Sequence, residues 1–249
     1  MSLAINEDLR AYDNFNQFFT RPLKPEARPI CAEPDSIACP VDGTISQLGT
    51  IDSESIFQAK GHQFSLTTLL AGQSQWVEKF QNGNFATMYL SPKDYHRIHM
   101  PIDGTLRQMS YVPGRLFSVS PATTRSIPGL FARNERVLCF FDTEYGPMAM
   151  ILVGALFVGS IETVWHGMVT PPHGKRLNHW YFGQDTEDQS TEGKSSAKSV
   201  TLNKGQEMGR FNMGSTVILL FPANSIHWDN TLSASTAVQM GIKIAARES

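Results

Sequence analysis

Short segments rich in β-branched and aromatic residues, separated by glycine, proline or Asn-Gly turns, constrain this fold most. They follow one another from Ile37 to the end of the chain. The clearest are residues 43–46, 85–90, 136–141, 148–157, 161–165 and 217–221. Runs of this length between turn residues are typical of β-strands. With no repeat and no clear linker, the pattern predicts one α+β domain over residues 1–249, in which short N-terminal helices pack on mixed or antiparallel sheets.

Two segments have helical rather than strand-like spacing. The first, followed by an extended proline-rich arm up to residue 30, has an aromatic stripe of Tyr12, Phe15, Phe18 and Phe19. Core packing is the commoner reason for such a stripe, and membrane contact is the alternative. The second, residues 65–80, has Ser65 in position to cap its N-terminus.

Composition excludes several classes of protein. The net charge of −2 and the pI of about 6.4 argue against a nucleic-acid partner bound through a basic surface. No apolar run is long enough to span a bilayer, and the first residues do not resemble a signal peptide. Cys31, Cys39 and Cys139 lack paired spacing, which predicts free thiols in a reducing compartment. Residues 183–199 are polar and aperiodic, as in an exposed loop.

A Gly-Ser pair near the C-terminal end carries the first chemical signal. Gly214 and Ser215 join a polar, glycine-bracketed stretch to the apolar run 217–221. Glycine permits backbone conformations closed to other residues, and the Ser215 hydroxyl lies beside the Gly214 carbonyl. Such a pair is either a simple strand entry or a bond at which the chain cuts itself.

Two histidines and one aspartate supply candidate acid–base groups. His96 and His99 lie three residues apart in the segment 91–101. On a helix this spacing could form half of a metal site, but the additional ligands of zinc motifs are missing, so we expect no metal and favour an acid–base site. The Asp42-Gly43 pair is first a turn signal. The Asp42 carboxylate could also orient a histidine.

Together these segments resemble phosphatidylserine decarboxylase of the membrane-associated bacterial and mitochondrial type. Each block is weak alone, but their order over nearly the whole chain is specific. The matching blocks are residues 15–23, 41–43, 58–61, 94–101, 112–114, 131–136, 153–155, 158–161, 204–209 and 214–216. The family usually has leucine where this chain has Met213, an exchange of one apolar residue for another. Its members usually carry a longer N-terminal segment, so a trimmed front end is one interpretation of this sequence.

The resemblance implies a self-processing zymogen. Ser215 Oγ would attack the Gly214 carbonyl and convert the amide to an ester, with His99 as its base and Asp42 fixing the His99 tautomer. β-Elimination and hydrolysis would then leave a pyruvoyl group derived from Ser215. The products would be a β chain, 1–214, and an α chain, 215–249, which stay associated.

The resemblance also implies the substrate and the cofactor. The pyruvoyl group would form a Schiff base with phosphatidylserine and accept the electrons released as CO2 leaves, giving phosphatidylethanolamine. His96 would protonate the carbanion or polarise the carboxylate. We expect a peripheral enzyme on the cytoplasmic side of the cell membrane. Association into a homodimer is compatible with the sequence. The aromatic stripe and residues 114–119 are candidates for the lipid contact.

Three other functions stay open from the residues. A serine hydrolase could use Ser215, His99 and Asp42, although no Gly-x-Ser-x-Gly elbow is present. A non-enzymatic module is a second, because the turn around Asp42 resembles the hairpins of biotinyl and lipoyl carriers; however, no lysine stands at its tip. A pyruvoyl decarboxylase acting on a soluble amino acid is the third.

Overall fold

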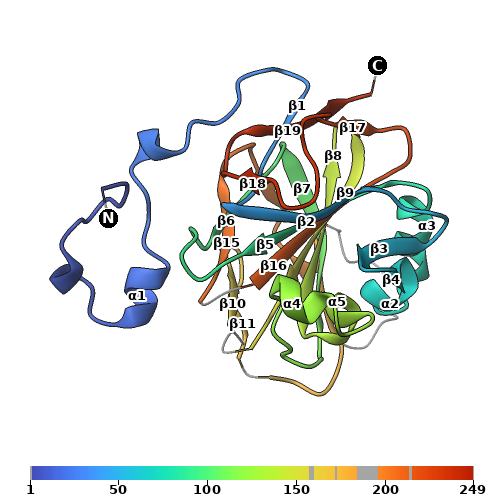
Figure 1. The fold of residues 1–249 in the computed structure, drawn as a ribbon, viewed down its shortest axis with the longest axis horizontal. Helices are drawn as coiled ribbons and strands as arrows, with labels where there is room; N and C mark the ends of the chain where they lie inside the picture. The colour runs from blue at the N-terminus through green and yellow to red at the C-terminus, as the bar shows by residue number, and fades with distance from the viewer. Residues whose placement is uncertain (1, 157–159, 172, 184–195, 213–214, 249) are drawn as a thin grey trace.

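The computed structural model describes residues 2–156, 160–171, 173–183, 196–212 and 215–248, and of residues 196, 197 and 215 it describes the backbone alone. Strands dominate, and all the helices are short (Figure 1). The predicted α+β class, with short N-terminal helices and mainly antiparallel sheets, is confirmed. Within the described residues, no helix is long and apolar enough to cross a bilayer.

The helices are shorter than the sequence predicts. They are η1 (Leu9–Ala11), α1 (Phe15–Phe19), η2 (Pro25–Ala27), α2 (Leu66–Leu69), α3 (Ser74–Phe80), α4 (Pro121–Thr124) and α5 (Leu130–Arg133). The Ser65 hydroxyl caps α2 by accepting from the Thr68 amide at 3.1 Å, as predicted. The single helix predicted over 65–80 is wrong, because Ala71 adopts a φ of 55° and separates α2 from α3.

Four sheets are formed by the described residues. The largest has ten strands: β13 (Ser196–Ala197), β12 (Asn178–Phe182), β7 (Gly104–Val112), β8 (Arg136–Thr143), β9 (Gly146–Val153), β16 (Ser215–Phe221), β5 (Asn84–Leu90), β2 (Gly43–Thr50) and β18 (Ala237–Val238) in order, with β14 (Val200–Leu202) also pairing with β7. The second consists of β11 (Gly167–Thr170), β10 (Ile161–Thr163), β15 (Glu207–Phe211) and β6 (Arg97–His99). The third consists of β1 (Ser36–Ala38), β19 (Lys243–Arg247) and β17 (Ile226–Trp228), and β3 (Ser55–Ala59) pairs with β4 (His62–Ser65).

The ten-stranded sheet has a hydrophobic cluster on each face. One cluster packs the sheet against α2, α3, α5 and the β3–β4 pair. The other cluster packs it against the three-stranded and four-stranded sheets. The alternation along β16 explains this: Val217 and Leu219 belong to one cluster, and Ile218 and Leu220 to the other. The apolar run that follows Ser215 is therefore a central strand buried on both faces.

Several predicted boundaries need correction. The strand predicted over 148–157 ends at Val153, and the strand predicted over 161–165 ends at Thr163. The predicted loop over 183–199 includes the short strand β13, which pairs with β12, while residues 184–195 lie outside the described part. Edge pairings of two or three residues leave too little periodicity in the sequence to be recognised.

Candidate active site

Three neighbouring strands bring the predicted residues to one edge of the large sheet. Ser215 pairs with Leu90 at the end of β5, and Thr44 in β2 pairs with Tyr89. At Gly43 a Cβ would lie 2.3 Å from the Tyr89 carbonyl oxygen, so only glycine permits this approach. The backbones of residues 43, 90 and 215 thus lie at the same level across β2, β5 and β16, and Asp42 directly precedes this level. The Asp-Gly pair forms a bend that enters β2, not a hairpin tip.

The candidate cleavage bond lies between two anchored points. The Phe211 amide donates to the His96 carbonyl at 3.0 Å, and four residues later Ser215 pairs with Leu90. Leu90 and His96 are themselves joined by a short segment. Residues 213–214 therefore join two backbone positions that both lie beside the histidine segment. Met213, Gly214 and the Ser215 side chain are outside the described residues.

His96 is fully buried, and its protonation can be assigned from its neighbours. Its Nδ1 lies 2.8 Å from the Asp94 carbonyl oxygen. A carbonyl can only accept, so Nδ1 carries the proton and Nε2 keeps its lone pair. Among the described residues, that Nε2 has no hydrogen-bond partner. The Phe19 ring packs on the imidazole with 4.1 Å between ring centroids. Burial lowers the pKa of His96 to about 4, so it is neutral at pH 7.

His99 is held by two hydrogen bonds. Nδ1 donates to the Gly205 carbonyl at 2.8 Å, which leaves the lone pair on Nε2. The Tyr95 hydroxyl donates to Nε2 at 3.1 Å. The His99 amide also donates to the Pro40 carbonyl at 2.9 Å, which ties β6 to the segment before Asp42. Burial lowers the pKa of His99 as well. Both histidines are thus poised as neutral bases.

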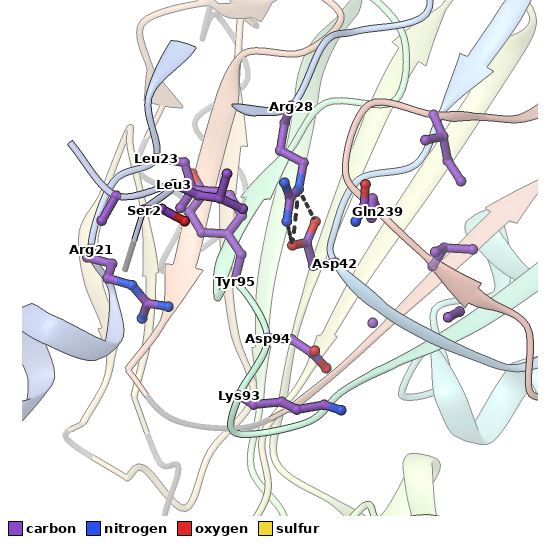
Figure 2. A pocket seen from close by; sticks show the side chains of 15 residues that line it. Ser2, Leu3, Arg21, Leu23, Arg28, Asp42, Lys93, Asp94, Tyr95 and Gln239 are labelled. Carbon is purple, nitrogen blue, oxygen red and sulfur yellow. Dashed lines mark hydrogen bonds and ion pairs between the residues drawn. The ribbon is translucent and has the colours of Figure 1, made fainter. Parts of the chain in front are cut away.

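Asp42 binds a cation instead of a histidine (Figure 2). Arg28 Nε donates to Asp42 Oδ1 at 2.8 Å, Arg28 Nη2 donates to Oδ2, and the Met240 amide donates to Oδ1 at 2.8 Å. The predicted orientation of His99 by Asp42 is therefore corrected: the Gly205 carbonyl orients the imidazole. The physical reason is that a nearly buried carboxylate is best satisfied by a bidentate guanidinium. A catalytic part for Asp42 stays a prediction.

A cavity of about 640 Å³ adjoins Asp42 and the segment before His96 (Figure 2). Its wall carries the charged side chains Arg21, Arg28, Asp42, Lys93 and Asp94, together with Tyr95. Cationic and anionic groups side by side suit a ligand that itself carries both charges. Apolar side chains of the N-terminal segment close one side of it: Leu3, Ala4 and Leu23.

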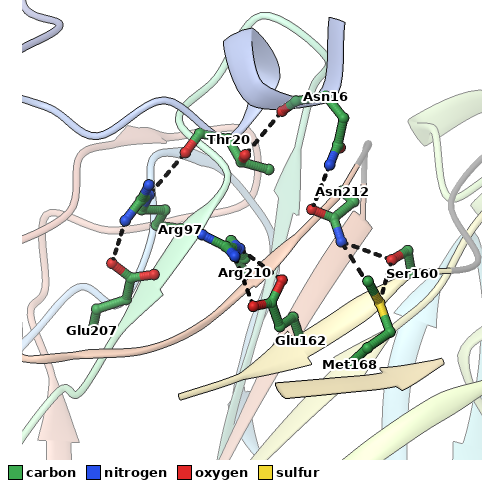
Figure 3. Close-up of polar contacts among 9 residues, drawn as sticks. All are labelled: Asn16, Thr20, Arg97, Ser160, Glu162, Met168, Glu207, Arg210 and Asn212. Atoms are coloured by element: carbon green, nitrogen blue, oxygen red, sulfur yellow. Dashed lines mark hydrogen bonds and ion pairs between the residues drawn. The ribbon is translucent and has the colours of Figure 1, made fainter. Parts of the chain in front are cut away.

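The N-terminal segment packs directly on the site (Figure 3). In α1, Asn16 donates to the Asn212 side chain at 3.1 Å, one residue before the undescribed pair 213–214. Arg97, between the two histidines, donates to the Thr20 carbonyl at 2.8 Å and pairs with Glu207 at 2.7 Å. These contacts join α1 and the residue that ends it to the histidine segment and to the residue just before the pair 213–214.

The described residues contain no group of three or more histidine, cysteine, aspartate or glutamate side chains arranged to hold a metal ion. The polar side chains of the site make hydrogen bonds within the protein instead. His96 bonds to a backbone carbonyl, His99 to a carbonyl and a phenol, and Asp42 to Arg28. What this arrangement can do is move protons with two neutral imidazoles.

Sequence reasoning missed the roles of Arg28 and Tyr95. Tyr95 directly precedes His96, so its place in the histidine segment was a usable signal. Arg28 offered none, because it lies in a proline-rich arm distant in sequence from Asp42. The aromatic stripe divides between its two interpretations: Phe19 is buried against His96, Phe18 is half-buried, and Phe15 is exposed.

The buried neutral His96 predicts a pH dependence of stability. Its folded-state pKa lies below its ordinary value of 6.5, so the unfolded chain binds the proton more readily. Stability from this group is complete above pH 6.5 and is lost as the pH falls toward 4, by at most about 1.4 kcal/mol per pH unit. The free energy of unfolding, measured with urea between pH 4 and 8, should depend less steeply on pH for His96→Gln than for the wild type. Equal slopes would remove the buried neutral imidazole from the account.

Nearly the whole chain is similar to proteins of one known family. The family model described as phosphatidylserine decarboxylase matches residues 15–246. Three relatives carry the name phosphatidylserine decarboxylase proenzyme. The protein of Delftia acidovorans is 53% identical over 99% of this chain and 82% of its own length. That of Pseudomonas putida is 54% identical over the same shares. That of Methylococcus capsulatus is 52% identical over 95% of this chain and 77% of its own length.

Proposed function

The chain belongs to the phosphatidylserine decarboxylase family, and from this premise we infer that the residues around Gly214 and Ser215 carry two successive reactions. The enzyme decarboxylates phosphatidylserine to phosphatidylethanolamine and CO2, a step of phospholipid synthesis, and it is made as a proenzyme. The first reaction is self-cleavage between Gly214 and Ser215. The second is the decarboxylation. The backbone contacts on either side of this bond are the observation that supports both: Phe211 bonds to His96, and Ser215 pairs with Leu90.

In the cleavage, the chain's own residues supply the base. The Nε2 lone pair of His99 faces the Tyr95 hydroxyl and is available to take the Ser215 proton when that contact opens. Its Nδ1 proton is fixed by the Gly205 carbonyl, so the tautomer needed for a base at Nε2 is already set. The fragments 1–214 and 215–249 follow from a cut at this bond.

The pyruvoyl group left at residue 215 would supply an electron sink that holds the substrate amine and accepts the electrons released with CO2. The site fits such a group, because the described residues leave the buried His96 Nε2 without a partner, close to the backbone that leads into Ser215. His96 Nε2 would take a proton from the ammonium group of the substrate and would return it to the carbon that loses CO2. Phe19 excludes water from this nitrogen, which protects the proton transfer from exchange with solvent.

The two fragments would stay together after cleavage. The smaller one contributes β16, which pairs with β5 and β9 of the larger one in the centre of the large sheet. It also contributes β17, β18 and β19, and both β18 and β19 pair with strands of the larger fragment. Separation would expose the fully buried face of β16, so association follows from the hydrophobic effect.

The test of the function is product formation by purified protein. Vesicles containing phosphatidylserine should yield CO2 and phosphatidylethanolamine, while free serine in the same assay should yield little. A decarboxylase of soluble amino acids would show the opposite preference. A serine hydrolase would leave the headgroup carboxylate in place and would run as one chain on a denaturing gel.

We also propose that the enzyme binds peripherally to the cytoplasmic face of the membrane through its N-terminal segment. Four of the ten large, exposed apolar side chains in the described residues lie in the first fifteen positions: Leu3, Ile5, Leu9 and Phe15. Exposed apolar side chains gathered in one segment suit an interfacial contact with lipid. The three free cysteines support a reducing compartment.

Phe15→Ser should weaken liposome binding and leave cleavage unchanged. The Phe15 side chain is 60% exposed, so its replacement removes lipid contact with little loss of packing. Full insertion of such a side chain is worth about 1.5–3 kcal/mol, or roughly tenfold or more in binding. Flotation with phosphatidylserine vesicles measures it. Phe57→Ser is the matched control, an exposed phenylalanine on β3. Equal binding by both variants and the wild type would place the lipid contact elsewhere.

A further inference from the structure

Arg28 connects the N-terminal arm to a residue of the site. It lies just after η2 in the extended arm, and its guanidinium points at the Asp42 carboxylate (Figure 2). Nε donates at 2.8 Å, Nη2 donates to the other carboxylate oxygen, and Nη1 donates to the Ala27 carbonyl at 2.7 Å. Only 11% of the Arg28 side chain and 10% of the Asp42 side chain are exposed. A bidentate pair this well buried fixes the plane of the carboxylate as well as its position.

The Asp42 carboxylate depends on Arg28 for its charge balance. Among the described residues, its other hydrogen-bond donor is the Met240 amide, which is neutral. A nearly buried carboxylate that loses its cation is left as an uncompensated charge, so it rotates toward solvent. That rotation removes the fixed negative charge from the neighbourhood of His99. The segment is close to His99, since the Pro40 carbonyl accepts from the His99 amide.

The arm that carries Arg28 also contacts Gly205, the residue whose carbonyl binds His99. The Cys31 amide donates to the Gly241 carbonyl at 2.8 Å. Ile30 packs over Gly205, where a Cβ would lie 2.7 Å from Ile30 Cγ1. Gly205 has a φ of 81° and supplies the carbonyl that accepts from His99 Nδ1. The same arm therefore contacts the partner of His99 and the carboxylate beside it, so its position and that of the base are coupled.

We propose that Arg28 is a positioning residue for self-cleavage, acting through Asp42; this rests on the proposed function. Arg28 holds the Asp42 carboxylate in one orientation through two hydrogen bonds. The fixed negative charge then favours the imidazolium that forms when His99 takes the Ser215 proton. Among the described contacts, Arg28 does not touch His99 itself.

The test measures the cleavage rate of full-length chain made by cell-free translation and followed on denaturing gels. Arg28→Ala should slow cleavage by about 10²-fold, the loss typical of a misplaced catalytic group. Arg28→Lys keeps the charge but loses the fork, so its loss should be smaller. Lys24→Gln is the matched control, because this cation of the same arm pairs with the exposed Glu7; its cleavage should match the wild type.

Two further readouts separate positioning from a purely structural role. Guanidinium ion at millimolar concentration should restore part of the rate to Arg28→Ala, since the cavity of about 640 Å³ reaches both residues of the pair. In an Asp42→Asn background, Arg28→Ala should cause little additional loss, because its effect passes through the carboxylate. Additive losses in the double variant, or a folded Arg28→Ala chain that cleaves at the wild-type rate, would overturn the inference. A wild-type chain that stays uncut would overturn the proposed function instead.

Discussion

Replacing Ser215 by alanine should leave a single full-length chain with no decarboxylase activity. The substitution removes one hydroxyl from the first residue of β16 and keeps the strand's pairing with Leu90, so the fold is retained. Without the hydroxyl no ester can form with the Gly214 carbonyl, and no pyruvoyl group can arise. Denaturing gels and a vesicle assay of the purified variant measure the two losses, both of which should be complete.

Ser225→Ala is the matched control for this experiment. Ser225 belongs to the same C-terminal fragment, and its hydroxyl donates to the Pro222 carbonyl in a turn. This variant should be cut and active. If Ser215→Ala still splits at the same bond, the nucleophile has been assigned wrongly.

The two histidines should fail at different stages. His99→Ala should stop cleavage, because the Nε2 lone pair that would take the Ser215 proton is lost. His96→Ala should be cut normally and lose decarboxylation by about 10²- to 10⁴-fold, the usual contribution of a general acid–base group. The first variant is scored as uncut chain on gels, the second as turnover per cleaved chain.

His227→Ala controls for the loss of an imidazole as such, since His227 is exposed on β17. A cut and fully active His96→Ala enzyme would remove His96 from the mechanism. Normal cleavage of His99→Ala would do the same for His99 as the base. Opposite phenotypes would exchange the two roles.

The strands were predictable where their side chains alternate or are wholly apolar. The run 217–221 could be read from the sequence because a central strand buried on both faces leaves a continuous apolar signature. The α2–α3 break could not, because the apolar spacing continues through Ala71 although its backbone does not. Edge strands such as β13 are too short to leave a period.

The site divides in the same way. Residues close together in sequence, such as Tyr95, His96 and His99, could be recognised as one group from the chain alone. Contacts between distant segments could not: the arm carrying Arg28 meets Asp42, and Phe19 of α1 meets His96. A histidine partner for Asp42 could be predicted from the sequence, because aspartate and histidine are common catalytic residues. Only the fold shows that the Asp42 carboxylate pairs with a guanidinium.

The intact mass of the purified wild-type protein is the most direct test of the account. The account predicts two species, one matching residues 1–214 and the other matching residues 215–249 with Ser215 converted to a pyruvoyl group. The smaller piece should resist N-terminal sequencing, because a ketone replaces its amine. A single species with the mass of all 249 residues, in protein that decarboxylates phosphatidylserine, would contradict the central claim.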